Sequence, residues 1–261
     1  MRSGTRLQKC IDCGLVFLEE WHNEINDRFF DDSIEIKTKY SDNKDKIEYW
    51  SYPENYTKYK DVFHRFFEER LKNIIKVNPN INSLLDIGSG YGFFLDYIRE
   101  KIPNVSGLEL DPDVMKYARD KLGLNVMSER IEYFESSERF DCITMCDVLE
   151  HLIDPVAVLE RCWNLLSSGG VIFIQVPNLV GFKLPFGHGW GLPHHIWQFG
   201  PRSLIKLVEN CGFSVHHWYT GVLGVIGVYK REGPTLLDSF IWATARRFKI
   251  GNRLMLVAIK K

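Results

Sequence analysis

The sequence predicts an α/β protein with a doubly wound, mostly parallel sheet, an antiparallel addition at one edge of the sheet and a small N-terminal appendage. Three observations support this fold class. In the middle of the chain, short apolar runs alternate with longer amphipathic segments, which is the pattern of repeated βα units. Near the C-terminus the apolar runs follow each other closely, which favours antiparallel pairing. The length of 261 residues suits one large domain with an appendage.

The appendage is predicted over residues 1–50 and the main domain over residues 51–261. The first segment contains a Cys-x-x-Cys pair, a charged and aromatic stretch, and a polar run from Lys37 to Lys46 that is typical of a linker. A helix is expected from about Glu54 to Val77, because apolar side chains recur there at helical spacing. Asn78-Pro79-Asn80 should end it.

Strands and helices are expected to alternate in the main domain. Asp111-Pro112 and Asp154-Pro155 each place an N-cap before a proline, which favours a helix start, and Gly169-Gly170 should close the second of these helices. The expected strands are Ser83–Ile87, Val105–Leu110, Asn125–Met127, Asp141–Cys146, Val171–Val176 and Phe213–Tyr219, followed by apolar runs at Val222–Tyr229 and Leu254–Ile259. The expected helices are Tyr91–Lys101, Pro112–Leu122, Pro155–Leu166 and Pro201–Asn210.

Composition limits the classes of function. The 33 basic and 34 acidic side chains leave a formal net charge of −1, which argues against a nucleic-acid substrate held through many phosphates. No apolar run reaches the roughly 18 residues of a membrane span, and no apolar segment of a secretory signal follows the first residues. Four of the six cysteines have apolar or amphipathic surroundings, which fits a cytoplasmic location better than a disulfide framework.

A glycine turn, Asp86-Ile87-Gly88-Ser89-Gly90-Tyr91-Gly92, follows the first strand of the main domain. Glycines there let the backbone turn sharply and approach a ligand. Asp86 lies at the strand end, where a carboxylate can order the loop and face a cationic ligand group. Glu109 ends the next strand about 20 residues downstream, where an acidic side chain can accept both hydroxyls of a ribose. The turn therefore predicts a site for a nucleotide-like cofactor.

These segments resemble those of class I, Rossmann-like S-adenosylmethionine-dependent methyltransferases, particularly the small-molecule branch that includes ubiquinone-type O-methyltransferases. The matching stretches are LLDIGSGYGFFL, GLELDP, RFDCITMCDVLEHLIDPVAVLERCWNLLSSGGVIFIQVPN and HHIWQFGPRSLIKLVENCGF. The resemblance implies a seven-stranded sheet with one reversed strand, and S-adenosylmethionine at the carboxyl ends of strands one to four. It also implies methyl transfer to a hydroxyl or an amine of a small molecule.

The resemblance further implies a set of cofactor-binding residues. They are Asp86, Gly88, Gly90, Glu109, Glu129, Cys146 and Asp147. The first three would line the methionine and ribose side of the cofactor, and Glu109 would hold the ribose. Glu129 would contact the adenine amino group, and the last two would flank the ligand at the end of the fourth strand. A surface position for Glu129 and a packing role for Cys146 stay open as alternatives.

Two other functions compete with methyl transfer. An NAD-type oxidoreductase would carry GxGxxG, but here Gly92 comes one place early and Phe93 fills the usual glycine position. A catalytically inactive member of the family, which binds the cofactor or a protein partner as a scaffold, would retain the same turn. The intact cofactor positions favour an active methyltransferase.

The segment from Pro177 to Gly200 is the candidate substrate loop. Long connections are usually lids or binding loops, and this one contains aromatic residues, prolines, glycines and three histidines: His188, His194 and His195. In the resembling enzymes a histidine of an HxxxF stretch lies near the mouth of the active site, and His195 with Phe199 matches that spacing. His195, or its neighbour His194, is therefore the candidate catalytic base. The alternative is that these histidines only order the loop.

Several acceptor classes lack their signatures. A DNA cytosine methyltransferase needs a Pro-Cys nucleophile, but here Met145 precedes Cys146. An adenine-amino enzyme usually carries an Asp/Asn-Pro-Pro-aromatic loop after the fourth strand, and a catechol-type enzyme carries a cluster of acids for magnesium. Neither pattern is evident. The expected partner is a small-molecule methyl acceptor, and no metal ligand is assigned.

Lys9-Cys10-Ile11-Asp12-Cys13-Gly14 resembles half of a four-cysteine zinc site. Structural zinc needs four ligands, and Cys-x-x-Cys supplies two. His22 is the nearest other ligand. A longer natural chain, a decayed site and a metal shared by two chains are all compatible with this pattern. An aromatic-rich β-hairpin that rests on the main domain without a metal is favoured.

Overall fold

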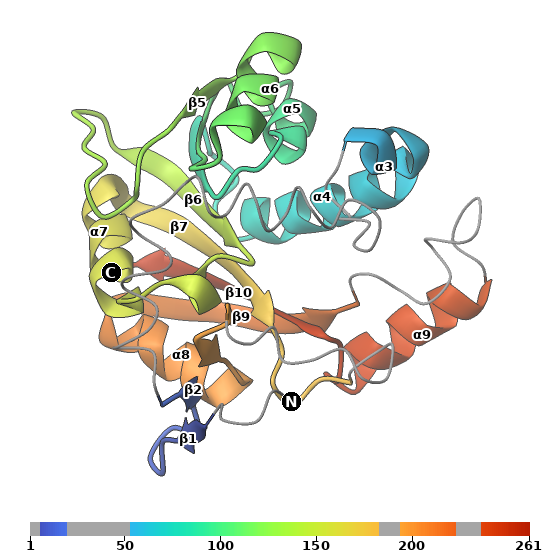
Figure 1. Cartoon of the computed structure of the whole chain (residues 1–261), viewed down its shortest axis with the longest axis vertical. Helices are drawn as coiled ribbons and strands as arrows, with labels where there is room; N and C mark the ends of the chain where they lie inside the picture. The colour runs from blue at the N-terminus through green and yellow to red at the C-terminus, as the bar shows by residue number, and fades with distance from the viewer. Residues whose placement is uncertain (1–5, 20–52, 183–193, 223–235) are drawn as a thin grey trace.

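The computed structural model describes residues 6–19, 53–182, 194–222 and 236–261, except for the side chains of Leu237 and Asp238. Its centre is a seven-stranded sheet with the order β5-β4-β3-β6-β7-β10-β9 (Figure 1). The strands are β3 (Ser83–Ile87), β4 (Asn104–Leu108), β5 (Asn125–Met127), β6 (Phe140–Cys146), β7 (Leu166–Pro177), β9 (Phe213–Gly221) and β10 (Arg253–Lys260).

The sheet is parallel from β5 to β7, and β10 runs antiparallel to both β7 and β9. The edge strand β9 is thus joined to the sheet by antiparallel pairing. This confirms the predicted seven-stranded, mostly parallel sheet and its antiparallel edge.

Helices cover both faces of the sheet (Figure 1). They are α3 (Pro53–Lys58), α4 (Lys60–Ile75), α5 (Phe93–Ile98), α6 (Pro112–Leu122), the 3-10 turn η1 (Leu149–His151), α7 (Pro155–Leu165), α8 (Pro201–Asn210) and α9 (Leu236–Arg247). Neighbouring strand residues join different cores, since Leu84 packs with α4 and α5 whereas Leu85 packs with α7 and α8. Strands buried on both faces explain why their sequences are continuously apolar.

Two of the expected elements were wrong in detail. The single helix expected from Glu54 to Val77 is broken at Tyr59, where the backbone has φ −117° and ψ 30°. The break accompanies a long-range contact, because Tyr56 of α3 stacks on Phe93 with 3.9 Å between ring centroids. Gly169-Gly170 does not close a helix but lies inside β7, near a register shift against β6.

A second, three-stranded sheet has the order β1-β2-β8. It consists of β1 (Leu7–Lys9), β2 (Val16–Leu18) and β8 (Trp197–Gln198), with antiparallel pairing throughout. The N-terminal hairpin therefore pairs with the segment that follows His195. The domain boundary near residue 50 stays a prediction, because residues 20–52 lie outside the described part of the chain.

The apolar run expected at Val222–Tyr229 lies outside the described residues after Val222. Among the described helices, none has the length and apolar character needed to cross a membrane.

Candidate active site

The order of the strands creates a crevice at one edge of the large sheet. From β3 the chain moves outward through β4 to β5, and then returns to β6 on the other side of β3. In doubly wound sheets, ligands bind where the order reverses in this way, beyond the carboxyl ends of the strands. A cavity of about 290 Å³ lies there. Predicted site residues in its wall are Gly88, Glu109, Glu129, Asp147 and His194.

The two glycines of the cofactor turn have left-handed backbone conformations, with φ of +70° at Gly88 and +56° at Gly90. A methyl group added at Gly88 would lie 2.4 Å from Cγ2 of Val148. One added at Gly90 would have no non-adjacent heavy atom of the described chain within 4 Å. Packing therefore requires the first glycine, whereas the second leaves open space beside the loop.

The carboxylate of Glu109 is held in place by the glycine loop. Its Oε2 accepts a hydrogen bond of 2.8 Å from the backbone N–H of Gly90, and its Oε1 accepts one of 2.9 Å from the N–H of Asp111. Burial raises the pKa of this carboxyl group, and the two N–H donors oppose that effect. Each carboxylate oxygen retains acceptor capacity. The group is thus able to accept the two hydroxyls of a ribose.

Asp86 ends β3 with a buried side chain that is 4% exposed. Thr144 Oγ1 donates a hydrogen bond of 2.5 Å to Asp86 Oδ1. Burial raises the pKa of Asp86 to about 6, against the opposing charge of Arg70 and the hydrogen bond from Thr144. A cationic ligand group nearby would favour the charged form. Asp86 does not line the cavity itself, and its carboxyl group contacts Thr144 of β6.

Arg70 is a functional candidate that the sequence analysis missed. Its guanidinium lies 4.2 Å from the ring centroid of Phe94, and its charge lowers the pKa of both Asp86 and Cys146. Within the described part of the chain it has no hydrogen bond and no ion pair. A half-buried cation without a carboxylate partner suits an anionic ligand group. The available signal was an arginine on the apolar face of a helix, three residues after Phe67.

Glu129 and Cys146 differ in their relation to the cavity. Glu129 follows β5 and lines the cavity, as its predicted adenine contact requires. Cys146 ends β6, packs against the core that contains α4 and α5, and is not among the lining residues. Burial raises the pKa of its thiol. These surroundings favour the packing role for Cys146.

Asp147 lines the cavity in a left-handed conformation, with φ of +56°. Such a conformation is costly for a residue other than glycine, and it often marks a functional site. Gln175 Nε2 donates a hydrogen bond of 2.8 Å to Asp147 Oδ2, and Arg253 Nε lies 2.8 Å from Oδ1 in an ion pair whose angle does not suit a hydrogen bond. The carboxylate is thus paired with β7 and β10. Asp147 shapes the cavity wall more than it offers a free charge.

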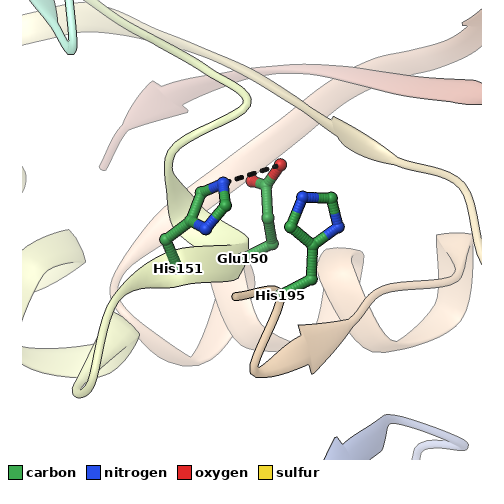
Figure 2. Close-up of side chains that lie close together, drawn as sticks. All are labelled: Glu150, His151 and His195. Carbon is green, nitrogen blue, oxygen red and sulfur yellow. Dashed lines mark ion pairs between the residues drawn. The ribbon is translucent and has the colours of Figure 1, made fainter. Parts of the chain in front are cut away.

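The candidate bases lie in the segment before β8, whereas His188 lies outside the described residues. The backbone oxygen of His194 accepts a hydrogen bond of 2.9 Å from His151 Nδ1. The ring of His195 meets that of His151 edge to face, with 4.7 Å between centroids (Figure 2). Burial, together with His151 and Arg253, lowers the pKa of His195 to about 4. At neutral pH His195 therefore has a free lone pair, but it is a weak base.

The family model described as methyltransferase domain matches residues 49–218. The chain belongs to this methyltransferase family. The family uses S-adenosylmethionine, and solved proteins of this fold contain S-adenosylmethionine or S-adenosylhomocysteine. Two groups of this methyltransferase fit that cofactor. Glu109, in the cavity wall, can accept hydroxyls, and Arg70, which does not line the cavity but acts on the charge of Asp86, has no carboxylate partner among the described residues.

Curated relatives of this methyltransferase include ubiquinone biosynthesis O-methyltransferases. The protein of Xanthomonas axonopodis pv. citri (strain 306) is 28% identical over 162 residues, which is 54% of this chain and 66% of the relative. The mitochondrial protein of Homo sapiens is 26% identical over 171 residues, which is 55% of this chain and 46% of the relative. The chain thus spans about half to two thirds of the length of these relatives.

Solved structures show the same fold. An amino pentose methyltransferase from Micromonospora echinaspora, with S-adenosylmethionine bound, matches with a TM-score of 0.53 and 16% identity. The match covers 76% of this chain and 92% of that protein. At this identity the likeness concerns the fold, and the acceptor has to be argued from the site.

Proposed function

We propose that this methyltransferase transfers a methyl group from S-adenosylmethionine to a hydroxyl or an amine of a small molecule. The observation that carries the proposal is a set of polar groups, at and behind the crevice, that can still bind a ligand. Glu109 retains acceptor capacity for ribose hydroxyls, Arg70 lacks an anionic partner among the described residues, and Asp86 is a buried carboxyl group whose charged form a cation would stabilise. Ribose, carboxylate and cationic centre are the polar parts of S-adenosylmethionine.

Three observations support a small acceptor. The relatives are named as ubiquinone biosynthesis O-methyltransferases. The formal net charge of −1 gives little attraction for nucleic acid. The cavity wall also contains many aliphatic side chains, which suit an apolar or aromatic acceptor. We further propose a reducing, cytoplasmic location, which the six free cysteines support.

S-adenosylmethionine brings an already activated methyl group, so the protein chiefly has to align the acceptor and exclude water. Ile87, Leu108 and Val148 surround the cavity with apolar surface that serves the second task. His195 has an unprotonated ring and can take a proton from an acceptor hydroxyl. His194 is the alternative base, because it lines the cavity.

Calorimetric titration with S-adenosylmethionine, and separately with NADH, tests the cofactor. Binding of the first compound alone is expected. Asp86→Ala should abolish this binding, while Asp120→Ala, at an exposed ion pair on α6, is a matched control that should retain it. Failure of the wild-type protein to bind S-adenosylmethionine would overturn the proposal, and binding of NADH in its place would favour an oxidoreductase.

Formation of S-adenosylhomocysteine with a panel of phenols, catechols, amines and sugars tests the acceptor class. His195→Ala should bind S-adenosylmethionine normally and turn over more slowly. Full turnover in that variant would remove the catalytic role of His195 and direct attention to His194. Cofactor binding without turnover of any acceptor would favour the scaffold alternative.

We also propose that the N-terminal hairpin is a partial zinc knuckle that braces β8 without a metal of its own. The N–H of Gly14 donates a hydrogen bond of 3.0 Å to the carbonyl oxygen of Cys10, and the backbone N–H groups of Asp12 and Cys13 lower the pKa of the Cys10 thiol. The N–H of Leu18 donates a hydrogen bond of 3.0 Å to the carbonyl oxygen of Ile196. Elemental analysis of the purified protein should find less than half a zinc per chain, and stoichiometric zinc would contradict this role.

A further inference from the structure

Glu150 is the most unusual buried group beside the cavity. It belongs to η1, directly before His151, and it is fully buried. Within the described part of the chain neither of its carboxyl oxygens has a hydrogen-bond partner. A buried carboxyl group without a partner is destabilising, and native proteins retain few of them without a reason.

Two histidine rings flank the Glu150 carboxyl group (Figure 2). The Oε1 atom of Glu150 lies 3.9 Å from Nε2 of His151. A carboxyl oxygen of Glu150 and one ring nitrogen from each of His151 and His195 lie within 4.8 Å of one another. A single water molecule can bridge such a distance. The ring of His195 has no hydrogen bond of its own among the described residues, so it is free to take part in such a bridge.

The orientation of His151 limits its own part in proton transfer. Its Nδ1 donates to the carbonyl oxygen of His194, so a neutral ring has its lone pair on Nε2, which faces Glu150. His151 therefore closes one side of the carboxyl group. His195 comes from the candidate substrate loop, and its ring lies on the other side of the carboxyl group from His151 (Figure 2). The residue before it, His194, lines the cavity.

The charges around the carboxyl group come from three elements. Burial, and then Asp147 directly after β6, raise the pKa of Glu150 well above its usual value, and Arg253 at the start of β10 opposes them. His194, His151 and Arg253 all disfavour a proton on His195, whereas Asp147 favours one. At equilibrium an exchangeable proton in this cluster therefore resides on the carboxyl group and not on the imidazole.

We propose that Glu150 is a positioning residue that receives, through His195, the proton of the acceptor hydroxyl. The inference rests on the proposed function. The acceptor O–H bond breaks and its proton goes to the lone pair of His195, while the N–H proton of the same ring passes to the Glu150 carboxylate, directly or through one water. The freed oxygen electron pair forms the bond to the methyl carbon. The carbon–sulfur bond breaks with its electrons on sulfur, which leaves S-adenosylhomocysteine, and Glu150 later releases its proton to solvent.

This arrangement predicts a pH dependence with a definite sign. The working state needs a deprotonated Glu150, whose pKa is raised, so turnover should rise with pH through that pKa. Below it, the rate should fall about tenfold per pH unit. A purely structural Glu150 would leave this profile unchanged.

The test combines turnover with a measurement that does not need an acceptor. Glu150→Gln is expected to lower kcat roughly 100-fold, flatten the pH profile and leave the affinity for S-adenosylmethionine unchanged. Glu150→Asp should recover part of the rate and the sloping profile. Glu160→Gln, at an exposed position on α7, is the matched control and should behave as wild type. In parallel, the ring nitrogen shifts of His195, assigned with His195→Gln, should show an inflection at the kinetic pKa in the wild type and none in Glu150→Gln.

Three results would overturn the inference. The first is identical His195 titrations in the wild type and in Glu150→Gln, and the second is full turnover with an unchanged pH profile in Glu150→Gln. The third is a stoichiometric divalent cation in the purified protein whose removal by a chelator abolishes turnover. Failure of the proposed function would differ from all three, because a wild type that does not bind S-adenosylmethionine could still show the coupled titration of His195.

Discussion

Two left-handed glycines of the cofactor turn can be compared with a third left-handed glycine outside it, which serves as the control. Gly88, Gly90 and Gly123 have φ of +70°, +56° and +66°, so alanine at any of them is strained by roughly 1–2 kcal/mol. At Gly88 the added methyl would also lie 2.4 Å from Val148 Cγ2, and overpacking of this kind costs about 1–3 kcal/mol more. We therefore expect Gly88→Ala to lower the free energy of unfolding by about 2–5 kcal/mol, and the other two variants by about 1–2 kcal/mol.

Urea unfolding and calorimetric titration with S-adenosylmethionine check these values. Gly123 caps the C-terminus of α6, so Gly123→Ala should bind the cofactor as the wild type does. Gly90→Ala should unfold like Gly123→Ala but bind at least about tenfold more weakly, because its methyl group would enter the open space beside the loop. Equal losses of stability at Gly88 and Gly123 would refute the packing argument. Unchanged affinity in Gly90→Ala would refute the placement of the cofactor.

Three further changes test individual groups. Arg70→Met keeps the packing on Phe94 but removes the charge, so it should weaken the binding of S-adenosylmethionine by about 1.5–3 kcal/mol. The binding of 5′-methylthioadenosine, which has no carboxylate, should not change. Equal weakening of the binding of both ligands would contradict this role of Arg70. Asp86 has a pKa of about 6 in the folded protein, above the usual 3.8 of an aspartate, so the folded state binds more protons between these values and stability falls as pH rises through them. Asp86→Asn should remove that fall and be about 3 kcal/mol more stable than wild type above pH 6, and a flat wild-type profile in urea unfolding would refute the assignment. Glu150→Leu removes a buried acid that has no hydrogen-bond partner among the described residues, so it should raise the free energy of unfolding by about 1–3 kcal/mol while turnover is lost; a destabilised variant would show that the carboxyl group has a structural partner.

Elements with local signals could be predicted from the sequence to the residue. The helix α6 spans Pro112–Leu122 as expected, because Asp111 accepts hydrogen bonds from the N–H groups of Asp113 and Val114, and Gly123 takes the left-handed position at its end. These signals lie within a few residues of the boundaries that they set. The break at Tyr59 has no such signal. It accompanies the stacking of Tyr56 on Phe93, a contact that exists only after the fold has formed.

The residues of the candidate site also fall into those that could be predicted from the sequence and those that could not. Gly88 and Glu109 could be predicted because the carboxyl ends of adjacent parallel strands meet at one edge, whatever else the chain does. Arg70 could not, since its position beside Asp86 depends on how α4 packs across the sheet. Glu150 was visible in the sequence, but its complete burial was not. Periodicity reports which face a residue takes, and it does not report whether a polar side chain there finds a partner.

Four ionisable residues, of which Arg70 and Glu150 were not predicted from the sequence, share one physical property. Arg70, Asp86 and Glu150 are charged or ionisable groups whose surroundings oppose their charge or leave them without a partner, and Asp147 adds a strained backbone conformation. Each of these features destabilises the protein without ligands, and Asp147 lies in the wall of the cavity. A chain optimised for stability alone would replace them with apolar or paired residues. The position of Asp86 near the end of β3, and of Asp147 and Glu150 just after β6, is therefore an independent reason, apart from the glycine turn, to place the chemistry there.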